Sequence, residues 1–360
     1  MYAVLSAAAF RCGCTPHFYF AFMGERIRRI DTRRLLFYLC AANAGKGIAG
    51  FREKGEKRLS HSVSKAAFVA IVGKPNVGKS SILNELLGEK IAIVTSKPQT
   101  TRTRIMGVLT RDNTQFVFLD TPGFHKAKTK LSDNMRRVVT SSIKDVDIVV
   151  LVVEPEGRLI EPELQLLENI KASGLPCILV INKIDLYTDK AVVARRITEL
   201  CALHTFDAVV PVSVLKKEGL DALLDELDGL SEEGEHYFPD DTLTDQPERV
   251  IAAEIIREKL LLNLQQEIPH GTAVLIERMR EREDQNIIDI EATIYCEKAS
   301  HKGMIIGKGG QCLKRIATAA RADLETFLDT HVNLKCWVKV QEGWRNQDSA
   351  IRNFGLSDDQ

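Results

Sequence analysis

Long apolar runs are missing from this sequence: no stretch approaches the roughly 20 residues that a helix needs to cross a bilayer. Net charge is missing as well, because 49 basic residues balance 49 acidic ones. The overall charge therefore neither favours nor excludes a nucleic-acid partner, and local clusters of basic residues must decide. The sequence has no internal repeat, and its 360 residues predict about two domains.

Clustered cysteines are lacking too. Only Cys12 and Cys14 lie close together, and a single C-x-C pair is weak spacing for a metal site. The remaining cysteines are scattered, as expected for reduced thiols in a cytosolic protein. They are Cys40, Cys177, Cys201, Cys296, Cys312 and Cys336.

Residues 1–65 differ from the rest of the chain, because they are rich in arginine, poor in acidic residues and without strand-like alternation. One interpretation is an organellar transit peptide. The other, which we favour, is upstream sequence translated from a start codon assigned too early, with Met23 or a later codon as the true start. In either case we expect disorder or a weak helix here, and no chemistry.

From residue 66 onward, short apolar runs alternate with segments of helical periodicity. Strands that alternate with helices predict an α/β domain with a mainly parallel sheet and helices on both faces. The predicted strands are 68–72, 115–119, 147–153, 177–181 and 209–212. The predicted helices are 80–87, 130–144, 162–172, 190–203 and 220–227. We place this domain at residues 66–230.

A second, smaller domain follows an acidic segment that contains Gly and Pro and is typical of a linker, 231–247. Pro247 can open a helix, and the residues after it have helical periodicity. Strands are predicted at 273–277, 287–295 and 332–340, with a glycine cluster and a helix between the last two. This order predicts a small α+β domain at residues 248–355.

The motif GKPNVGKS follows the first predicted strand and matches G-x-x-x-x-G-K-[S/T]. Gly73 and Gly78 allow the backbone N–H groups to surround phosphate oxygens, and the next helix adds its positive end. Lys79 is predicted to contact the β- and γ-phosphates, and the Ser80 hydroxyl to bind Mg²⁺. We expect the loop to bind a nucleoside triphosphate through Gly73, Asn76, Val77, Gly78, Lys79, Ser80 and Ser81.

A second motif, DTPG, comes directly after the predicted strand 115–119. A carboxylate in that place, Asp120, is suited to holding Mg²⁺ through water, and the N–H of Gly123 can contact the γ-phosphate. Between the two motifs, residues 95–105 are polar and lack a strand pattern. We expect this loop to be a switch that supplies a second Mg²⁺ ligand, Thr101, with Thr100 as the alternative.

A third motif, NKID, follows the predicted strand 177–181. The Asp185 carboxylate can accept hydrogen bonds from both N1–H and N2–H of guanine, whereas adenine has an acceptor at N1 and no amine at that edge. Asn182 is expected to brace the loop, and the Lys183 stem to cover the base. The three motifs together predict a GTP/GDP site.

The order and spacing of these motifs resemble a translation-factor-class GTPase domain. The resemblance implies a fifth motif at Ser213 and Val214, where valine departs from the usual alanine. It also implies slow hydrolysis, because Phe124 cannot orient water as glutamine does, so that His125, the backbone, a metal or a partner must do it. Asn76 occupies a position that binds K⁺ in related GTPases.

The stretch HKGMIIGKGGQCLKRI fits the G-x-x-G loop of a KH domain, in which two helices meet at a glycine turn that approaches the sugar-phosphate chain. An apolar groove beside such a loop takes unstacked bases. The predicted element order is that of a type II KH fold. The expected RNA-binding residues are Lys302, Ile306, Gly307, Lys308, Gly309, Gly310 and Lys314.

Taken together, these motifs and the stretches FPDD, AAEIIREKLL and CWVKVQEGW resemble the Era family of ribosome-assembly GTPases from about residue 66 to 355. The resemblance implies a P-loop GTPase domain followed by a KH type II domain. It implies GTP-controlled binding of the 3′ end of 16S ribosomal RNA and maturation of the pre-30S particle by a monomer. It also implies a cytoplasmic protein that can associate with the inner face of the cell membrane.

Two other functions are compatible with part of this pattern. A GTPase that modifies transfer RNA would need an added catalytic domain or a reactive terminal cysteine, and this sequence ends in LSDDQ. A structural RNA-binding protein with an inactive nucleotide site would not need Lys79, Ser80 and Asp120. A hydrolysis assay with Lys79→Ala as control separates these alternatives.

Overall fold

The computed structural model describes residues 63–357 except 98, 125–128, 158, 266–267 and 283–285. Residues Ser60–Gln360 make one compact unit. The predictions for residues 1–65 and for His125 therefore lie outside the described residues, apart from the last three residues of the extension. The first strand, β1 (Lys65–Val72), already begins within that interval.

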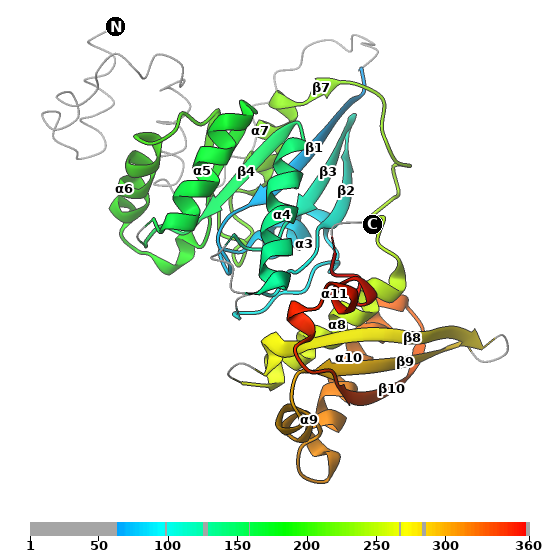
Figure 1. Cartoon of the computed structure of the whole chain (residues 1–360). Helices are drawn as coiled ribbons and strands as arrows, with labels where there is room; N and C mark the ends of the chain where they lie inside the picture. The colour runs from blue at the N-terminus through cyan, green and yellow to red at the C-terminus, as the bar shows by residue number, and fades with distance from the viewer. Residues whose placement is uncertain are drawn as a thin grey trace, which may run out of the picture. The chain divides into compact units, whose positions relative to one another are not determined.

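A mainly parallel sheet forms the centre of the first domain, as predicted (Figure 1). Its order is β2-β3-β1-β4-β5-β6, and only the β2–β3 pair is antiparallel within this series. Besides β1, the strands are β2 (Ile105–Arg111), β3 (Thr114–Asp120), β4 (Ile148–Val153), β5 (Cys177–Ile181) and β6 (Ala208–Pro211). The sequence prediction missed β2, because this edge strand is half-exposed and Gly107 interrupts its apolar run.

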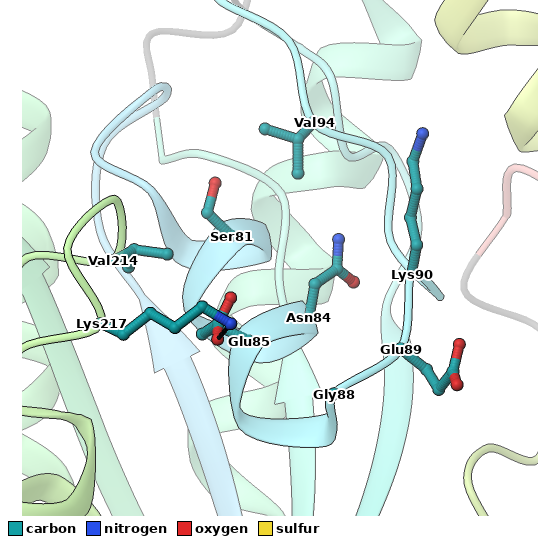
Figure 2. Close-up of a pocket in the computed structure, with 9 residues that line it drawn as sticks. All are labelled: Ser81, Asn84, Glu85, Gly88, Glu89, Lys90, Val94, Val214 and Lys217. Carbon is teal, nitrogen blue, oxygen red and sulfur yellow. Dashed lines mark ion pairs between the residues drawn. The ribbon is translucent and has the colours of Figure 1, made fainter.

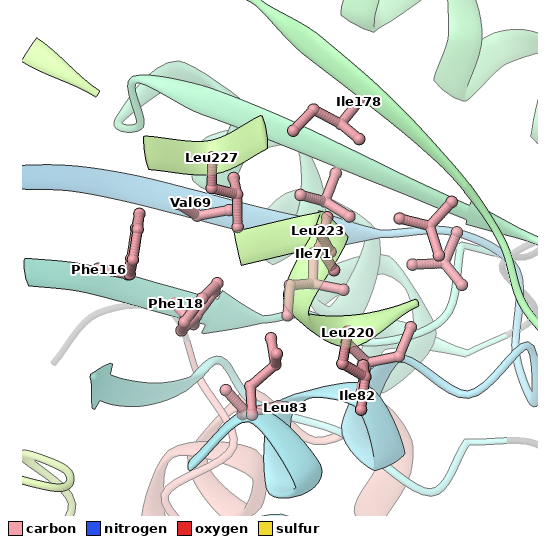
Figure 3. Close-up of a cluster of buried hydrophobic side chains, with 14 of the residues drawn as sticks. Val69, Ile71, Ile82, Leu83, Phe116, Phe118, Ile178, Leu220, Leu223 and Leu227 are labelled. Atoms are coloured by element: carbon pink, nitrogen blue, oxygen red, sulfur yellow. The ribbon is translucent and has the colours of Figure 1, made fainter. Parts of the chain in front are cut away.

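Helices cover both faces of this sheet. On one face pack α3 (Lys79–Leu87) and α7 (Leu220–Leu230), and Figure 3 shows their leucines and isoleucines against Val69 and Ile71 of β1. The other face is covered by α4 (Lys130–Lys144), α5 (Glu161–Ser173) and α6 (Lys190–Cys201). Alternate residues of β1 enter the two cores, as the period of two in a strand requires.

The second domain has the predicted order of helices and strands. It consists of α8 (Glu248–Asn263), β8 (Thr272–Arg282), β9 (Ile287–Cys296), α9 (Ala299–Ile306), α10 (Gln311–Leu328) and β10 (His331–Val340). Its sheet has the order β10-β9-β8, with β8 antiparallel and β10 parallel to β9. A short helix, α11 (Asp348–Asn353), was not predicted, because six residues are too few to show a helical period.

The segment predicted as a linker is bound to the first domain over most of its length. Its short strand β7 (Glu232–Glu233) pairs with β1. Further along, the side chain of Gln115 donates to the carbonyl of Phe238 at 2.8 Å, and the N–H of Val108 donates to the carbonyl of Leu243 at 2.8 Å. This acidic segment therefore follows a defined course and contacts β1, β3 and β2, which its composition did not indicate.

The two domains also share a small apolar cluster. It joins Leu131 and Met135 of α4 to Ala273, Trp344, Ala350 and Ile351 of the second domain. Beside it, Nζ of Lys130 lies 2.6 Å from a carboxylate oxygen of Asp348. In the part of the chain that the structure describes, no helix is long and apolar enough to cross a membrane.

Candidate guanine-nucleotide site and RNA-binding loop

The phosphate loop connects β1 to α3 at the carboxyl edge of the sheet. Gly78 has a φ of 101°, and a Cβ there would lie 2.2 Å from Nδ2 of Asn182. Only glycine fits both conditions. Since Lys79 is the first residue of α3, the N-terminus of that helix faces the loop, where the aligned peptide dipoles favour an anion.

Lys79 is buried, and its ammonium group donates to the carbonyls of its own loop. Nζ lies 3.2 Å from the Gly73 oxygen and 3.0 Å from the Lys74 oxygen. Burial lowers the pKa of Lys79 to about 8, while the charge of Asp120 acts in the opposite direction. A triphosphate would supply negative charge that stabilises the ammonium form.

Three side-chain oxygens converge beside Lys79. The Ser80 hydroxyl donates to Oδ2 of Asp120 at 2.5 Å and lies 2.9 Å from Oγ1 of Thr101. Oγ1 of Thr101 is itself 3.4 Å from the same carboxylate oxygen. The predicted metal ligands Ser80, Thr101 and Asp120 are thus brought together from α3, the polar loop and the end of β3.

This set of oxygens fits Mg²⁺, which prefers hydroxyl, carboxylate and water ligands. Asp120 is fully buried, and its Oδ1 has no hydrogen-bond partner among the described residues. Burial raises the pKa of the Asp120 carboxyl to about 6, against the charge of Lys79 and several hydrogen bonds. A cation with its water ligands would satisfy the unpaired oxygen and stabilise the carboxylate.

Thr100, the alternative ligand, faces elsewhere. Its hydroxyl donates to the carbonyl of Lys97 at 2.7 Å and lies 2.8 Å from Oγ1 of Thr95. These contacts close the loop on itself. The geometry therefore favours Thr101 over Thr100 for the metal.

The DTPG turn lies directly against the phosphate loop. A Cβ on Gly123 would lie 2.6 Å from Cα of Pro75, and the N–H of Phe124 donates to the Gly73 carbonyl at 3.1 Å. The Phe124 ring is buried, with the guanidinium of Arg136 5.4 Å from its centre. Gly123 is thus close to the predicted γ-phosphate position, whereas the Phe124 side chain points into the core.

The NKID loop lies at the carboxyl end of β5, beside the phosphate loop. Nδ2 of Asn182 donates to the Val77 carbonyl at 2.8 Å, so that Asn182 joins the two loops. Nζ of Lys183 donates to the Asn76 carbonyl at 2.6 Å. The Asp185 carboxylate accepts from the Ser213 hydroxyl at 2.6 Å, which brings the predicted fifth motif to the NKID loop.

Sequence reasoning missed Glu154, which follows β4 directly. Its carboxylate lies 2.6 Å from Nζ of Lys183 and 3.5 Å from Nζ of Lys74. It therefore connects the lysines of two loops at the edge where β1, β4 and β5 end. The sequence feature that could have indicated Glu154 is a carboxylate directly after a buried strand.

Next to the phosphate loop, a pocket of about 350 Å³ opens beside α3 (Figure 2). Two predicted nucleotide-binding residues, Ser81 and Val214, line it, and Lys217 pairs with Glu85 at 2.5 Å. Asn76 of the phosphate loop is exposed, and its Nδ2 donates to the Ser96 carbonyl at 2.6 Å.

The glycine loop of the second domain lies between α9 and α10. Gly307 has a φ of 73°, and a Cβ there would lie 2.6 Å from Cβ of Cys312, so glycine is required. Gly309 and Gly310 also have positive φ, and nothing lies within 4 Å of a Cβ at either. The loop is therefore open to a ligand on the side of its last two glycines.

Basic side chains surround this loop. Lys308 and Lys314 are exposed, while Lys302 and Ile306 are half-buried. The predicted RNA-binding residues lie on α9, on the glycine loop and in the first turn of α10, and Ile305 of α9 is buried beneath them in the core.

Comparison with known families gives two matches. A family model described as "50S ribosome-binding GTPase" matches residues 68–183. A model described as "KH domain" matches residues 267–345. The two matches fall on the two domains of the structure and agree with the predicted fold class.

Curated relatives match over nearly their whole length. GTPase Era of Clostridioides difficile (strain 630) is 48% identical over 294 residues, which cover 82% of this chain and 99% of that protein. GTPase Era of Syntrophus aciditrophicus (strain SB) is 48% identical over 295 residues, which cover 82% of this chain and 96% of that protein.

Two solved structures are similar over both domains. A variant of Aquifex aeolicus Era bound to GDP.AlF4⁻ has a TM-score of 0.78 and 38% identity, covering 81% of this chain and 99% of that one. Era in complex with MgGDPNP and nucleotides 1506–1542 of 16S ribosomal RNA has a TM-score of 0.79 and 38% identity, covering 82% and 99%.

Proposed function

This chain belongs to the Era family of GTPases, and from this premise we propose that it binds the 3′ end of 16S ribosomal RNA under the control of GTP and assists assembly of the small ribosomal subunit. The observation that carries the proposal is that Thr101 of the polar loop lies at Ser80 and Asp120, in one compact unit with the glycine loop at 307–310. A similar protein has been solved with both MgGDPNP and 16S RNA.

In this proposal, the phosphate loop and Lys79 bind the triphosphate, and Asp185 with Ser213 selects guanine. Ser80, Thr101 and Asp120 hold Mg²⁺, which neutralises charge that develops on the phosphate oxygens. A bound γ-phosphate would stabilise Thr101 in the position beside Ser80 and Asp120. Loss of phosphate therefore releases the loop, which makes residues 95–105 the switch.

Among the residues that the structure describes, the attacking water lacks an evident side chain to orient it, because Phe124 is buried in the core. We propose that K⁺ bound near Asn76 supplements the positive charge that an arginine finger supplies in other GTPases. Intrinsic turnover is then slow, and the protein acts as a timer.

RNA is proposed to bind where the N–H groups of residues 307–310 can approach the sugar-phosphate chain. Lys302, Lys308 and Lys314 supply charge there, and Ile306 an apolar wall. We propose the division into a GTPase domain at 66–230, a connecting segment at 231–247 and a KH domain at 248–355. Action as a cytoplasmic monomer, with contact to the inner face of the cell membrane, is proposed from the family alone.

Crosslinking tests this function. The full chain is irradiated with ribosomal RNA in the presence of GDPNP, and the bound RNA segment is sequenced. We expect the 3′ end of 16S RNA, and loss of the crosslinks in a Lys308→Glu/Lys314→Glu variant. Crosslinks to transfer RNA, or crosslinks unchanged in that variant, would contradict the proposal.

A further inference from the structure

Arg102 follows the proposed magnesium ligand Thr101 directly, but its side chain enters the other domain. Arg102 is 2% exposed. Nη1 donates to the Thr272 carbonyl at 2.6 Å, and Nη2 donates to the His270 carbonyl at 2.8 Å. The side chain of Thr101 therefore contacts the proposed Mg²⁺ ligands of the first domain, while the side chain of Arg102 contacts backbone carbonyls of the second domain.

The second domain presents a defined cradle to this guanidinium. Trp344 donates its indole N–H to the Gly271 carbonyl at 2.9 Å, and the Arg102 guanidinium lies 5.7 Å from the Trp344 ring centre. Three consecutive carbonyls, of residues 270–272, are therefore each hydrogen-bonded by Arg102 or Trp344. Buried donors and acceptors paired in this way are costly to separate.

Other residues of the second domain also hold the polar loop. Arg257 donates to the Thr100 carbonyl, and Lys97 donates to the carbonyls of Leu261 and Leu264 at the end of α8. The negative end of a helix favours a cation in that place. Arg257 therefore contacts the peptide unit that precedes Thr101, whereas Arg102 follows Thr101 directly and places its own side chain in the second domain.

We propose that Arg102 is a positioning residue through which the KH domain holds Thr101 at the Mg²⁺ site. The inference rests on the proposed role of Thr101. Withdrawal of Thr101 would strain or extract a buried guanidinium and break its two hydrogen bonds to the carbonyls of His270 and Thr272. By linkage, docking of the KH domain on the loop strengthens binding of MgGTP, and MgGTP strengthens that docking. GDP, which does not need Thr101, is bound independently of Arg102.

A double-mutant cycle on the full chain tests this. The variants are Arg102→Met, Thr101→Ala and the double variant, with Arg104→Ala as control, because Arg104 is exposed in the same segment. The readouts are the affinities for fluorescent GDPNP and GDP as a function of Mg²⁺, and hydrogen exchange of the amides at 100–104. If Arg102→Met does not fold, Arg102→Lys keeps the charge and serves in its place.

We expect Arg102→Met to weaken MgGDPNP roughly 10-fold or more, the scale of charge-assisted hydrogen bonds, and to leave GDP within about twofold. In the double variant, Arg102→Met should cause little further loss of MgGDPNP affinity beyond that of Thr101→Ala, because the effects of coupled residues are not additive. Amides 100–104 exchange faster, and Arg104→Ala changes nothing.

Three results would overturn the inference. If Thr101→Ala leaves the Mg²⁺-dependent preference for GDPNP intact, the proposed role of Thr101 fails, and the role of Arg102 fails with it. If Thr101→Ala removes that preference but Arg102→Met or →Lys does not reduce it, only the positioning role fails. If Arg102→Met lowers the affinities for GDPNP and GDP equally, Arg102 has only a structural role.

Discussion

The hydroxyl of Ser213 donates a hydrogen bond of 2.6 Å to the carboxylate of Asp185. The two residues come from the ends of β6 and β5, 28 positions apart in sequence. Ser213 is fully buried and also accepts from the N–H of Lys216 at 3.2 Å. Its hydroxyl therefore fixes the orientation of the carboxylate, whose remaining lone pairs can accept from guanine.

Replacement of this hydroxyl gives the first prediction. Ser213→Ala should weaken GTP and GDP equally, by about tenfold, because the carboxylate loses a charge-assisted hydrogen bond that orients it. Fluorescent-nucleotide titration measures this. Ser231→Ala, whose hydroxyl only donates to a helix carbonyl, is the control. A larger loss for GTP than for GDP would place Ser213 at the phosphates instead.

The variant Asp185→Asn should change the base preference of the site from guanine to xanthine. The new amide still accepts from N1–H, but its NH₂ group faces the guanine amine and pairs with the exocyclic oxygen of xanthine. We expect GTP affinity to fall roughly 100-fold or more, with XTP bound in its place. Failure of XTP to bind a folded variant would argue that Asp185 does not read the base.

Hydrolysis should depend on the monovalent cation. Turnover in K⁺ is expected to exceed that in Na⁺ roughly tenfold, well below the roughly 10³–10⁵ of an arginine finger. Asn76→Ala should remove the difference in turnover between K⁺ and Na⁺. The same turnover in both salts for the unaltered protein would show that Asn76 serves another purpose, such as its hydrogen bond to the Ser96 carbonyl.

The glycine loop should bind RNA largely through charge. The Lys308→Gln/Lys314→Gln double variant should bind RNA more weakly. The slope of log affinity against log salt should become less steep by about 1.4, since each phosphate contact to a single strand contributes about 0.7. Lys144→Gln, exposed on the first domain, should leave the slope unchanged. An unaltered slope in the double variant would place the RNA elsewhere.

Much of this site could be predicted because its motifs are local. GKPNVGKS, DTPG and NKID each follow a buried strand, and the carboxyl ends of parallel strands meet at one edge. Sequence alone therefore brought Lys79, Asp120 and Asp185 to a single site. The second domain could be predicted for the same reason, since the sequence signal for its glycine turn lies between two helices that follow one another in the chain.

Contacts between distant segments could not be predicted. Arg102 contacts a carbonyl 170 positions away, and nothing in QTTR indicates that this arginine is buried in the other domain. Glu154 meets Lys183 only because β4 and β5 are neighbours in the sheet. The acidic connecting segment is held along the sheet by hydrogen bonds of its backbone, some of them to the Gln115 side chain, and amino-acid composition does not reveal such bonds.

The most direct measurement is the affinity of the full chain for an oligonucleotide of the 16S 3′ end, taken with GDPNP and with GDP in the same buffer and Mg²⁺. The account predicts tighter RNA binding with GDPNP, and loss of the difference in Thr101→Ala. Equal affinity in the two nucleotide states would contradict it.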